Sequence, residues 1–453
     1  MTIETTLAGV AGEETFQPKQ VRDTKPEQRE WIERCVWTDR MLKRLEETQE
    51  ETVWFSLWDK VWDRDNLTHA AWSVIWNEGS PGVDHQTTEA FRLAREKEIE
   101  KLAEELRTGT YKPLPARRTW IEKLGSADLR PLGIPPVRDR VVQTALKHVI
   151  EPILERDFAR ESYGFRPGKS AHQAIRRVEE ELEQGRRWVV DADLKSYFDT
   201  IPHDRLMEKV RRRIADGGIL KLIESYLKAG VLEAGKRWQE TTQGTPQGSV
   251  ISPLLANLYL NDLDHEMEKK GRKMVRYADD FVVLCTTKAE AEEVLEEIQR
   301  WVKQEGLSLH PTKTKIVTLK EGFDFLGFHF TEGREGRTVK WPRKKSVAKL
   351  RETIRERTRR LSGESMGAII VSIHPTLRGW HGYFRTSQLN ALEGIDGWIR
   401  RRLRSLLRFR AKKAGISKGR ENRTYPNRWF QEHGLFSLAG YPDSKASIPQ
   451  GNY

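Results

Sequence analysis

Hydrophobic residues change their spacing along this chain, and the change divides it into zones. From about residue 115 to residue 330, short runs rich in β-branched residues alternate with helical patterns, which is typical of a mixed α/β domain. Beyond Trp341 the strand signals end and helices with arginines between their apolar positions follow. We therefore expect a domain boundary near residues 331–337. Ahead of these zones, apolar residues recur at helical spacing: Trp54, Leu57, Trp58, Val61 and Trp62.

One predicted strand, over residues 186–195, combines an apolar face with an acidic one. Its alternation places Val190 and Ala192 on one face and Asp191 and Asp193 on the other. Carboxylates at a strand end can hold a hard cation, although a solvated strand end would show the same pattern. The strand alone does not decide between these two interpretations.

A second acidic element lies over residues 274–284, where two β-prone runs are joined by Ala-Asp-Asp. This pattern predicts a hairpin with Asp279 and Asp280 at its tip, although aspartate favours turns in any protein. Three carboxylates from the strand and the hairpin together could hold two Mg²⁺ ions about 4 Å apart, the arrangement used in two-metal phosphoryl transfer. One ion would activate a 3′-hydroxyl nucleophile, and the other would hold a triphosphate and neutralise the leaving pyrophosphate.

A third element is rich in glycine and proline and covers residues 243–257. We predict a loop followed by a helix, with Ser252 as the N-cap and Pro253 at the first helical position. Backbone freedom at Gly244 and Gly248 would let the loop approach a flat or anionic ligand closely. A glycine-rich connector without a ligand would have the same composition.

Charge and composition narrow the function classes. The chain has 453 residues, a net charge of +12 and 37% hydrophobic residues, which excludes a polytopic membrane protein and allows two or three domains. Residues 341–430 hold 23 Lys and Arg against 6 Asp and Glu, a net charge of +17 that leaves −5 for the remainder. A polyanion is therefore the expected partner. Two cysteines exclude a disulfide scaffold, and the N-terminus lacks a secretory or transit pattern, so we expect a cytosolic protein without a membrane partner.

Taken in order, these segments resemble reverse transcriptases, and in detail the group II intron-encoded family. Residues 277–280 match the YxDD motif, residues 193–199 match the first catalytic motif, and residues 243–260 are close to the family's GTPQG string. Four further segments are similar to fingers, palm and maturase regions: residues 129–135, 162–167, 306–328 and 377–384. The resemblance implies an α+β right-hand polymerase fold of fingers and palm followed by an α-helical thumb/maturase domain.

The resemblance also implies domain limits and partners. The expected units are an N-terminal extension (1–52), fingers and palm (53–335), a thumb/maturase domain (336–410) and a short basic region for DNA (411–453). No CxxC pairs follow, so no HNH endonuclease is expected. The expected partners are group II intron RNA, template RNA with a DNA primer, dNTPs and target DNA. The oligomeric state stays open.

Roles for single residues follow from the same resemblance. It selects Asp193, rather than Asp191, to join Asp279 and Asp280 as catalytic ligands of two Mg²⁺ ions. Four more positions are implied at the nucleotide: Phe198 against the ribose 2′-hydroxyl, Gln247 beside the incoming base, and the cations Lys123 and Arg130 on the triphosphate. Lys313 is implied as a general acid for pyrophosphate. The positions expected to bind RNA are Arg400, Arg401, Arg404 and Arg408.

The leading hypothesis is an RNA-directed DNA polymerase that is also the maturase of its own intron. Two alternatives remain: a domesticated reverse transcriptase of phage defence or spacer acquisition, and a non-catalytic RNA-binding splicing factor. Clustered carboxylates at Asp193, Asp279 and Asp280 count against the last, because a pure binder does not need them. The basic helices could also grip only a template–primer duplex, and an RNA ligand would make affinity fall steeply with salt.

Overall fold

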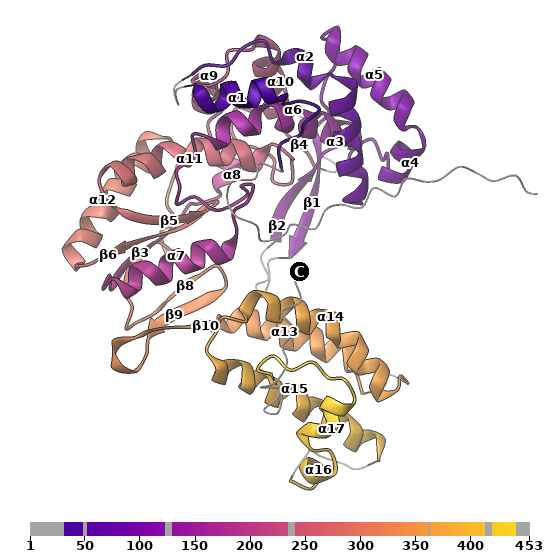
Figure 1. Cartoon of the computed structure of the whole chain (residues 1–453), viewed down its shortest axis with the longest axis vertical. Coiled ribbons are helices and arrows are strands. Elements are labelled where there is room, and N and C mark those ends of the chain that lie inside the picture. Colours follow the sequence, from indigo (N-terminus) through magenta and orange to yellow (C-terminus); the bar gives the residue numbers. More distant parts are fainter. Residues whose placement is uncertain are drawn as a thin grey trace, which may run out of the picture.

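The computed structural model describes residues 31–48, 52–122, 129–233, 241–360, 363–412 and 419–440. Lys123 lies outside these ranges, and for Arg130 only the backbone is described. In Figure 1 the chain passes from a helical lobe at the top, through a sheet at the left, to a second helical group at the bottom. This order agrees with the expected sequence of fingers, palm and thumb.

The first lobe packs helices around a small sheet of order β2-β1-β4. Its strands are β1 (Ala116–Glu122), β2 (Leu129–Ile134) and β4 (Val231–Leu232). Its helices are α1 (Asp39–Glu47), α2 (Trp58–Val61), α3 (Arg64–Trp76), α4 (Thr88–Leu93), α5 (Arg95–Arg107), α6 (Val137–Glu155), α9 (His203–Arg211) and α10 (Gly217–Ala229). The tryptophan-rich pattern near the start packs into this lobe, with Trp54, Leu57 and Val61 buried in its core.

The second part is a four-stranded sheet of order β5-β6-β3-β7, which is the expected palm. Its strands are β3 (Trp188–Asp193), β5 (Lys273–Tyr277), β6 (Asp280–Cys285) and β7 (Lys315–Thr318). Helices α11 (Ser252–Lys269) and α12 (Lys288–Gln304) cover one face, where Val190 and Ala192 are buried. Helix α7 (Ala171–Glu183) covers the other face, and the one-turn helix α8 (Tyr197–Thr200) follows β3.

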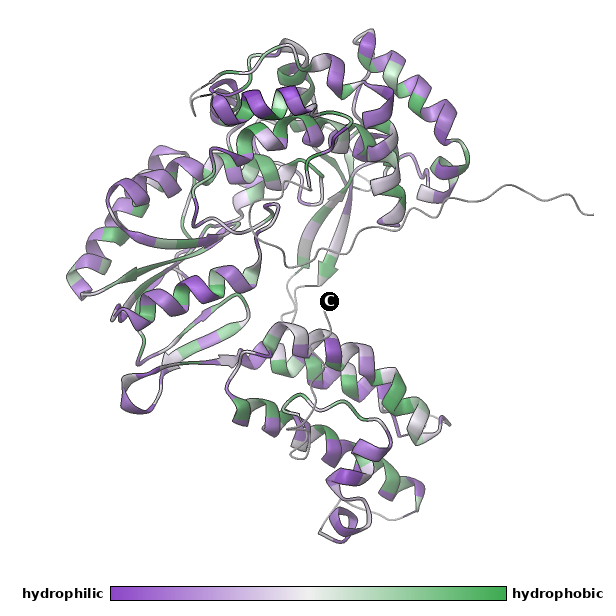
Figure 2. Ribbon diagram, viewed as in Figure 1, coloured by the Kyte–Doolittle hydropathy of each residue, from purple (hydrophilic) through white to green (hydrophobic). Residues whose placement is uncertain are grey.

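Burial explains why the central strands of the palm and the outer helices of the protein differ in polarity. Strand β6 has buried side chains on both faces and is continuously apolar after Asp280. The outer helices α5 and α12 are mainly hydrophilic and keep only narrow apolar stripes (Figure 2). These stripes are Ile99, Leu102 and Leu106 on α5, and Ala291, Val294 and Ile298 on α12.

A three-stranded sheet of order β10-β9-β8 connects the palm to the last domain. Its elements are β8 (Phe323–Phe325), β9 (Phe328–Glu332), the short helix η1 (Arg334–Gly336) and β10 (Thr338–Pro342). Phe323, Phe325 and Phe330 pack in one core with α7 and the palm strands. The domain boundary expected at residues 331–337 therefore falls inside a continuous sheet.

The last domain consists of helices α13 (Lys344–Arg357), α14 (Met366–Phe384), α15 (Leu389–Arg410), α16 (Gly419–Thr424) and α17 (Asn427–Glu432). The predicted apolar face of α15 is buried at Leu392, Ile395 and Leu403. Phe430 and Leu435 belong to the same core. The described part of the expected C-terminal region thus packs with the thumb helices and not apart from them.

Candidate active site

The register of the palm sheet brings the predicted carboxylates together. Strands β3 and β6 are antiparallel, and Asp193 is directly opposite Asp280. Tyr277 pairs with Asp280 across the β5–β6 hairpin, so Ala278 and Asp279 form a two-residue loop at its tip. Directly opposed residues share a face of the sheet, so Asp193 and Asp280 project from the same side. The strand and hairpin predicted from the sequence thus meet at one edge.

The hairpin tip is held by a buried arginine that sequence reasoning missed. Arg276 is fully buried and pairs with Asp264 of α11, with Nε 2.8 Å from Oδ1. Its Nη1 donates to Oδ1 of Asn257 at 3.0 Å and to the carbonyl of Ala278 at 2.9 Å. Ala278 has a φ of 59°, a strained conformation for a residue with a Cβ. The guanidinium therefore fixes the carbonyl of the strained residue between the strand and Asp279.

The motif at residues 162–167 supports the same hairpin from outside. The amide of Tyr163 donates to the carbonyl of Arg276 at 2.8 Å, which extends the sheet by one short bridge. A Cβ on Gly164 would lie 2.3 Å from the amide nitrogen of Ala278, so only glycine fits there. Asn257 donates to the carbonyl of Gly164 at 2.7 Å. One side chain of α11 thus ties both segments together.

The site carries more negative charge than its neighbours balance. Burial, together with Asp191, Asp279 and Asp193, raises the pKa of Asp280 to about 7. Burial also raises the pKa of Asp191 to about 6, with Asp193 adding to the shift and Lys315 opposing it. Carboxylate pKa values rise in this way where burial and neighbouring carboxylates disfavour the charged form. An all-oxygen donor set of this kind suits a hard divalent cation, so these residues fit the metal that the fold class implies.

Lys313 already contacts the triad. Its Nζ lies 2.8 Å from Oδ2 of Asp193, and its side chain is 61% exposed. The segment that carries it is anchored by the amide of His310, which donates to the carbonyl of Asp193 at 2.7 Å. Lys313 thus places an exposed cation beside one of the predicted carboxylates.

The glycine-rich loop connects the fingers sheet to the palm. The amide of Gly133 on β2 donates to the carbonyl of Gln247 at 2.6 Å, and the amide of Thr245 donates to the carbonyl of Phe198 at 2.6 Å. Gly248 has a φ of 105°, and a Cβ there would lie 2.5 Å from the carbonyl oxygen of Gly133. The predicted cap was displaced by one residue: Ile251 is the N-cap, and Ser252 is the first, buried residue of α11.

Of the predicted nucleotide-binding residues, three are described with their side chains. Phe198 follows Asp193 in α8 and is only 8% exposed, Gln247 is half-buried on the glycine-rich loop, and Lys313 touches the triad. The backbone of Arg130 pairs with Ile121 in the β1–β2 ribbon. Lys123 lies beyond the described residues, so its place in the site stays a prediction.

The predicted RNA-binding arginines separate into two groups. Arg401 is exposed and Arg400 half-buried on α15. Arg404, by contrast, is 7% exposed, and its Nε donates to the carbonyl of Tyr425 at 2.8 Å, which weighs against an RNA contact. Arg408 forms an ion pair with Glu421 of α16, with its side chain 19% exposed. These two arginines hold α16 and α17 against α15. Most of the Arg404 side chain is therefore covered by protein.

Comparisons with known proteins agree with this geometry. Residues 121–330 match the family "Reverse transcriptase (RNA-dependent DNA polymerase)", and residues 347–425 match "Group II intron, maturase-specific domain". The chain is 41% identical to Protein YkfC of Escherichia coli over 59% of its own length and 81% of that protein. It is 40% identical to the group II intron-encoded protein LtrA of Lactococcus lactis over 44% of its own length, but this match spans only 33% of LtrA.

A solved chain of a "Partial Cas6-RT-Cas1--Cas2 complex" also matches, with 25% identity and a TM-score of 0.36, over 55% of this chain and 43% of that one. Fold, triad and family matches together define an RNA-directed DNA polymerase with a helical thumb. The chain belongs to the group II intron-encoded reverse transcriptase/maturase family, as its motifs predicted. Among the described helices, none is long and apolar enough to cross a bilayer.

Proposed function

We propose that this chain copies RNA into DNA by extending a primer 3′-hydroxyl, with Asp193, Asp279 and Asp280 as ligands of two Mg²⁺ ions. The observation that carries the proposal is the register that sets Asp193 opposite Asp280, with Asp279 next to it on the hairpin. When bound, the ions would supply Lewis acidity at the attacking and leaving oxygens. The chain's own task is to hold the carboxylate oxygens on a rigid sheet edge.

The remaining residues of the site have roles that follow from their positions. Lys313 would transfer its contact from Asp193 to the departing pyrophosphate and donate a proton there. Phe198, a buried residue of α8, would exclude a ribose 2′-hydroxyl, and Gln247, half-buried on the glycine-rich loop, would lie by the incoming nucleotide. Arg130, on β2, and Lys123 would bind the triphosphate, Arg130 through its forked guanidinium and Lys123 as a point charge.

We propose that the helical domain binds folded intron RNA and so assists splicing. The charge of residues 341–430 supports this, as does the exposed Arg401. Arg351 and Arg355 both lie over the ring of Trp398, at 5.4 and 5.6 Å from its centroid, and form a basic cluster on α13 and α15. RNA of this kind is recognised by shape and phosphate contacts. Target DNA would be a second polyanion for the same part of the chain.

One experiment tests both halves of the proposal. Purified full-length protein is given an RNA template with an annealed DNA primer, dNTPs and Mg²⁺, and primer extension is measured. In a parallel assay it is given an intron RNA at low salt, and RNA binding and splicing are measured. Asp279→Ala should abolish extension while RNA binding and splicing assistance persist. Extension by Asp279→Ala would contradict the metal assignment, and wild-type extension without any effect on splicing would leave a polymerase that is not a maturase.

A further inference from the structure

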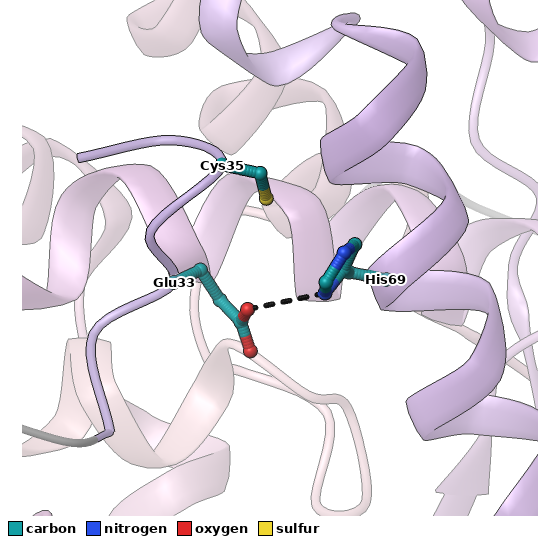
Figure 3. A group of neighbouring side chains, drawn as sticks. All are labelled: Glu33, Cys35 and His69. Carbon is teal, nitrogen blue, oxygen red and sulfur yellow. Dashed lines mark ion pairs between the residues drawn. The ribbon is translucent and has the colours of Figure 1, made fainter. Parts of the chain in front are cut away.

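A second group of metal-ligating side chains lies where the N-terminal segment crosses α3. Glu33 and Cys35 come from this segment and His69 from α3, and all three point into one space (Figure 3). One ligand atom from each side chain lies within 4.8 Å of the other two. Oε2 of Glu33 is 3.3 Å from Nδ1 of His69. The palm triad uses none of these residues.

The backbone around the group is well anchored. Ile32, Val36 and Trp37 are buried in the core of the fingers lobe, on either side of Glu33 and Cys35. The indole nitrogen of Trp37 donates to the backbone carbonyl of His148 on α6 at 3.0 Å. The backbone that carries Glu33 and Cys35 is thus held by core packing and by α6, whereas the side chain of His69 is 49% exposed.

His148 adds an independent observation that points to a cation. Asn66 donates its amide nitrogen to the carbonyls of Lys60 and Ala145, at 2.7 and 3.1 Å, so its amide oxygen must be the atom that faces His148. Nδ1 of His148 lies 2.8 Å from that oxygen and therefore carries the proton. Its Nε2 then carries a lone pair and lies 3.9 Å from Oε1 of Glu33. Within the described chain no group donates to this nitrogen.

Nε2 of His148 and Oε1 of Glu33 are both hydrogen-bond acceptors, and at 3.9 Å from each other they would be stabilised by a positive ion bound near them. The His148 side chain is only 13% exposed, so water reaches this nitrogen poorly.

We propose that Glu33, Cys35 and His69 bind one transition-metal ion of the Zn²⁺ type, with Nε2 of His148 facing the other oxygen of the Glu33 carboxylate. Sulfur, imidazole and carboxylate in one tetrahedral set suit Zn²⁺ and are poor ligands for Mg²⁺. The ion fastens the N-terminal segment to α3.

The test uses the full-length protein, freed of metal and titrated with Co²⁺ as a spectroscopic substitute. Wild-type protein should develop a thiolate-to-cobalt charge-transfer band at one equivalent, and Zn²⁺, but not excess Mg²⁺, should remove it. Cys35→Ser should lose the band, and His69→Gln should weaken Co²⁺ binding by more than about tenfold. The matched control is Cys285→Ser, because Cys285 is the chain's other cysteine and is buried in β6.

A wild-type protein without the band would overturn the site, as would a band that survives Cys35→Ser or disappears in Cys285→Ser. Folding is checked by circular dichroism of each metal-free variant. A second measurement on wild-type protein alone is the rate of Cys35 modification by a disulfide reagent. Zn²⁺ should slow this rate at least about tenfold through direct ligation. An unchanged rate means that Glu33 and His69 form only a surface ion pair.

Discussion

Arg276 and Asp264 form an enclosed ion pair beneath the catalytic hairpin, with side chains 0% and 4% exposed. Two charges can be buried together at this depth only because the guanidinium also satisfies Asn257 and the carbonyl of Ala278. The ion pair therefore joins β5 to α11, and the contact of Arg276 with the carbonyl of Ala278 also sets the conformation of the loop that carries Asp279.

Replacing Arg276 with lysine should damage both stability and activity. Lysine keeps the charge but cannot reach Asp264, Asn257 and Ala278 together, so buried acceptors lose their donors. We expect unfolding to become easier by about 3–5 kcal/mol, as for a broken buried pair, and primer extension to fall further than stability explains. Denaturant melts and single-turnover extension measure the two effects. Arg212→Lys, at a side chain 50% exposed, is the control and should change neither.

Phe198→Ala should admit ribonucleotides. Phe198 is 8% exposed, and its backbone carbonyl accepts a hydrogen bond from the amide of Thr245 at 2.6 Å, a contact that the substitution keeps. The ratio of rNTP to dNTP incorporation should rise by about tenfold or more, the scale of removing one steric contact. Tyr197→Phe, which removes only a hydroxyl bonded to the carbonyl of Ala256, should leave the ratio unchanged. Equal ratios in both variants would remove Phe198 as the gate.

The two kinds of arginine on α15 should respond differently to alanine. Arg401→Ala removes an exposed charge, so RNA affinity should fall and the slope of log affinity against log salt should flatten by about one unit. Arg404→Ala leaves the carbonyl of Tyr425 and the amide oxygen of Asn427 without their donor, so it should cost about 1–3 kcal/mol of folding stability. Filter binding across a salt series and thermal melts separate the two. An Arg404→Ala protein of normal stability that binds RNA weakly would restore the original prediction for Arg404.

Gly248→Ala tests the contact between the glycine-rich loop and β2. The added Cβ would meet the carbonyl of Gly133 at 2.5 Å, which would push the loop away from the fingers sheet. We expect the affinity of the enzyme for dNTP to fall by a larger factor than its turnover rate. Gly271→Ala shares a positive φ but has no atom within 4 Å of the added Cβ, so it should cost only about 1–2 kcal/mol of backbone strain. If the two variants have the same kinetic profile, strain alone accounts for the effect.

The strand and hairpin that carry Asp193, Asp279 and Asp280 could be predicted from the sequence because each forms a local pattern. Alternation put Asp191 and Asp193 on one strand face, and the Ala-Asp-Asp turn marked a hairpin. Which of the two strand aspartates pairs with Asp280 depends on sheet register, and a register is a long-range property. The resemblance, and not the pattern, selected Asp193.

The residues that were missed or misassigned depend on contacts between distant segments. Arg276 looked like one more residue of a strand, although a charge inside an apolar run is costly unless it is paired, and that signal was present. The spacing of Arg404 along α15 indicated an exposed basic face, but in the structure α16 and α17 cover this residue. Glu33, Cys35 and His69 share no motif spacing, so only tertiary packing brings them together.

We propose that Asp193, which pairs with Asp280 in the palm sheet, is catalytic and that Asp191, its neighbour on the same face, is not. The most direct test is single-turnover, Mg²⁺-dependent extension on an RNA template with Asp193→Asn and Asp191→Asn compared side by side. These are identical substitutions two residues apart. Asp193→Asn should slow extension by at least about a hundredfold, and Asp191→Asn should stay close to the wild-type rate. Near-normal extension by Asp193→Asn, or an equal loss in both variants, would contradict the account.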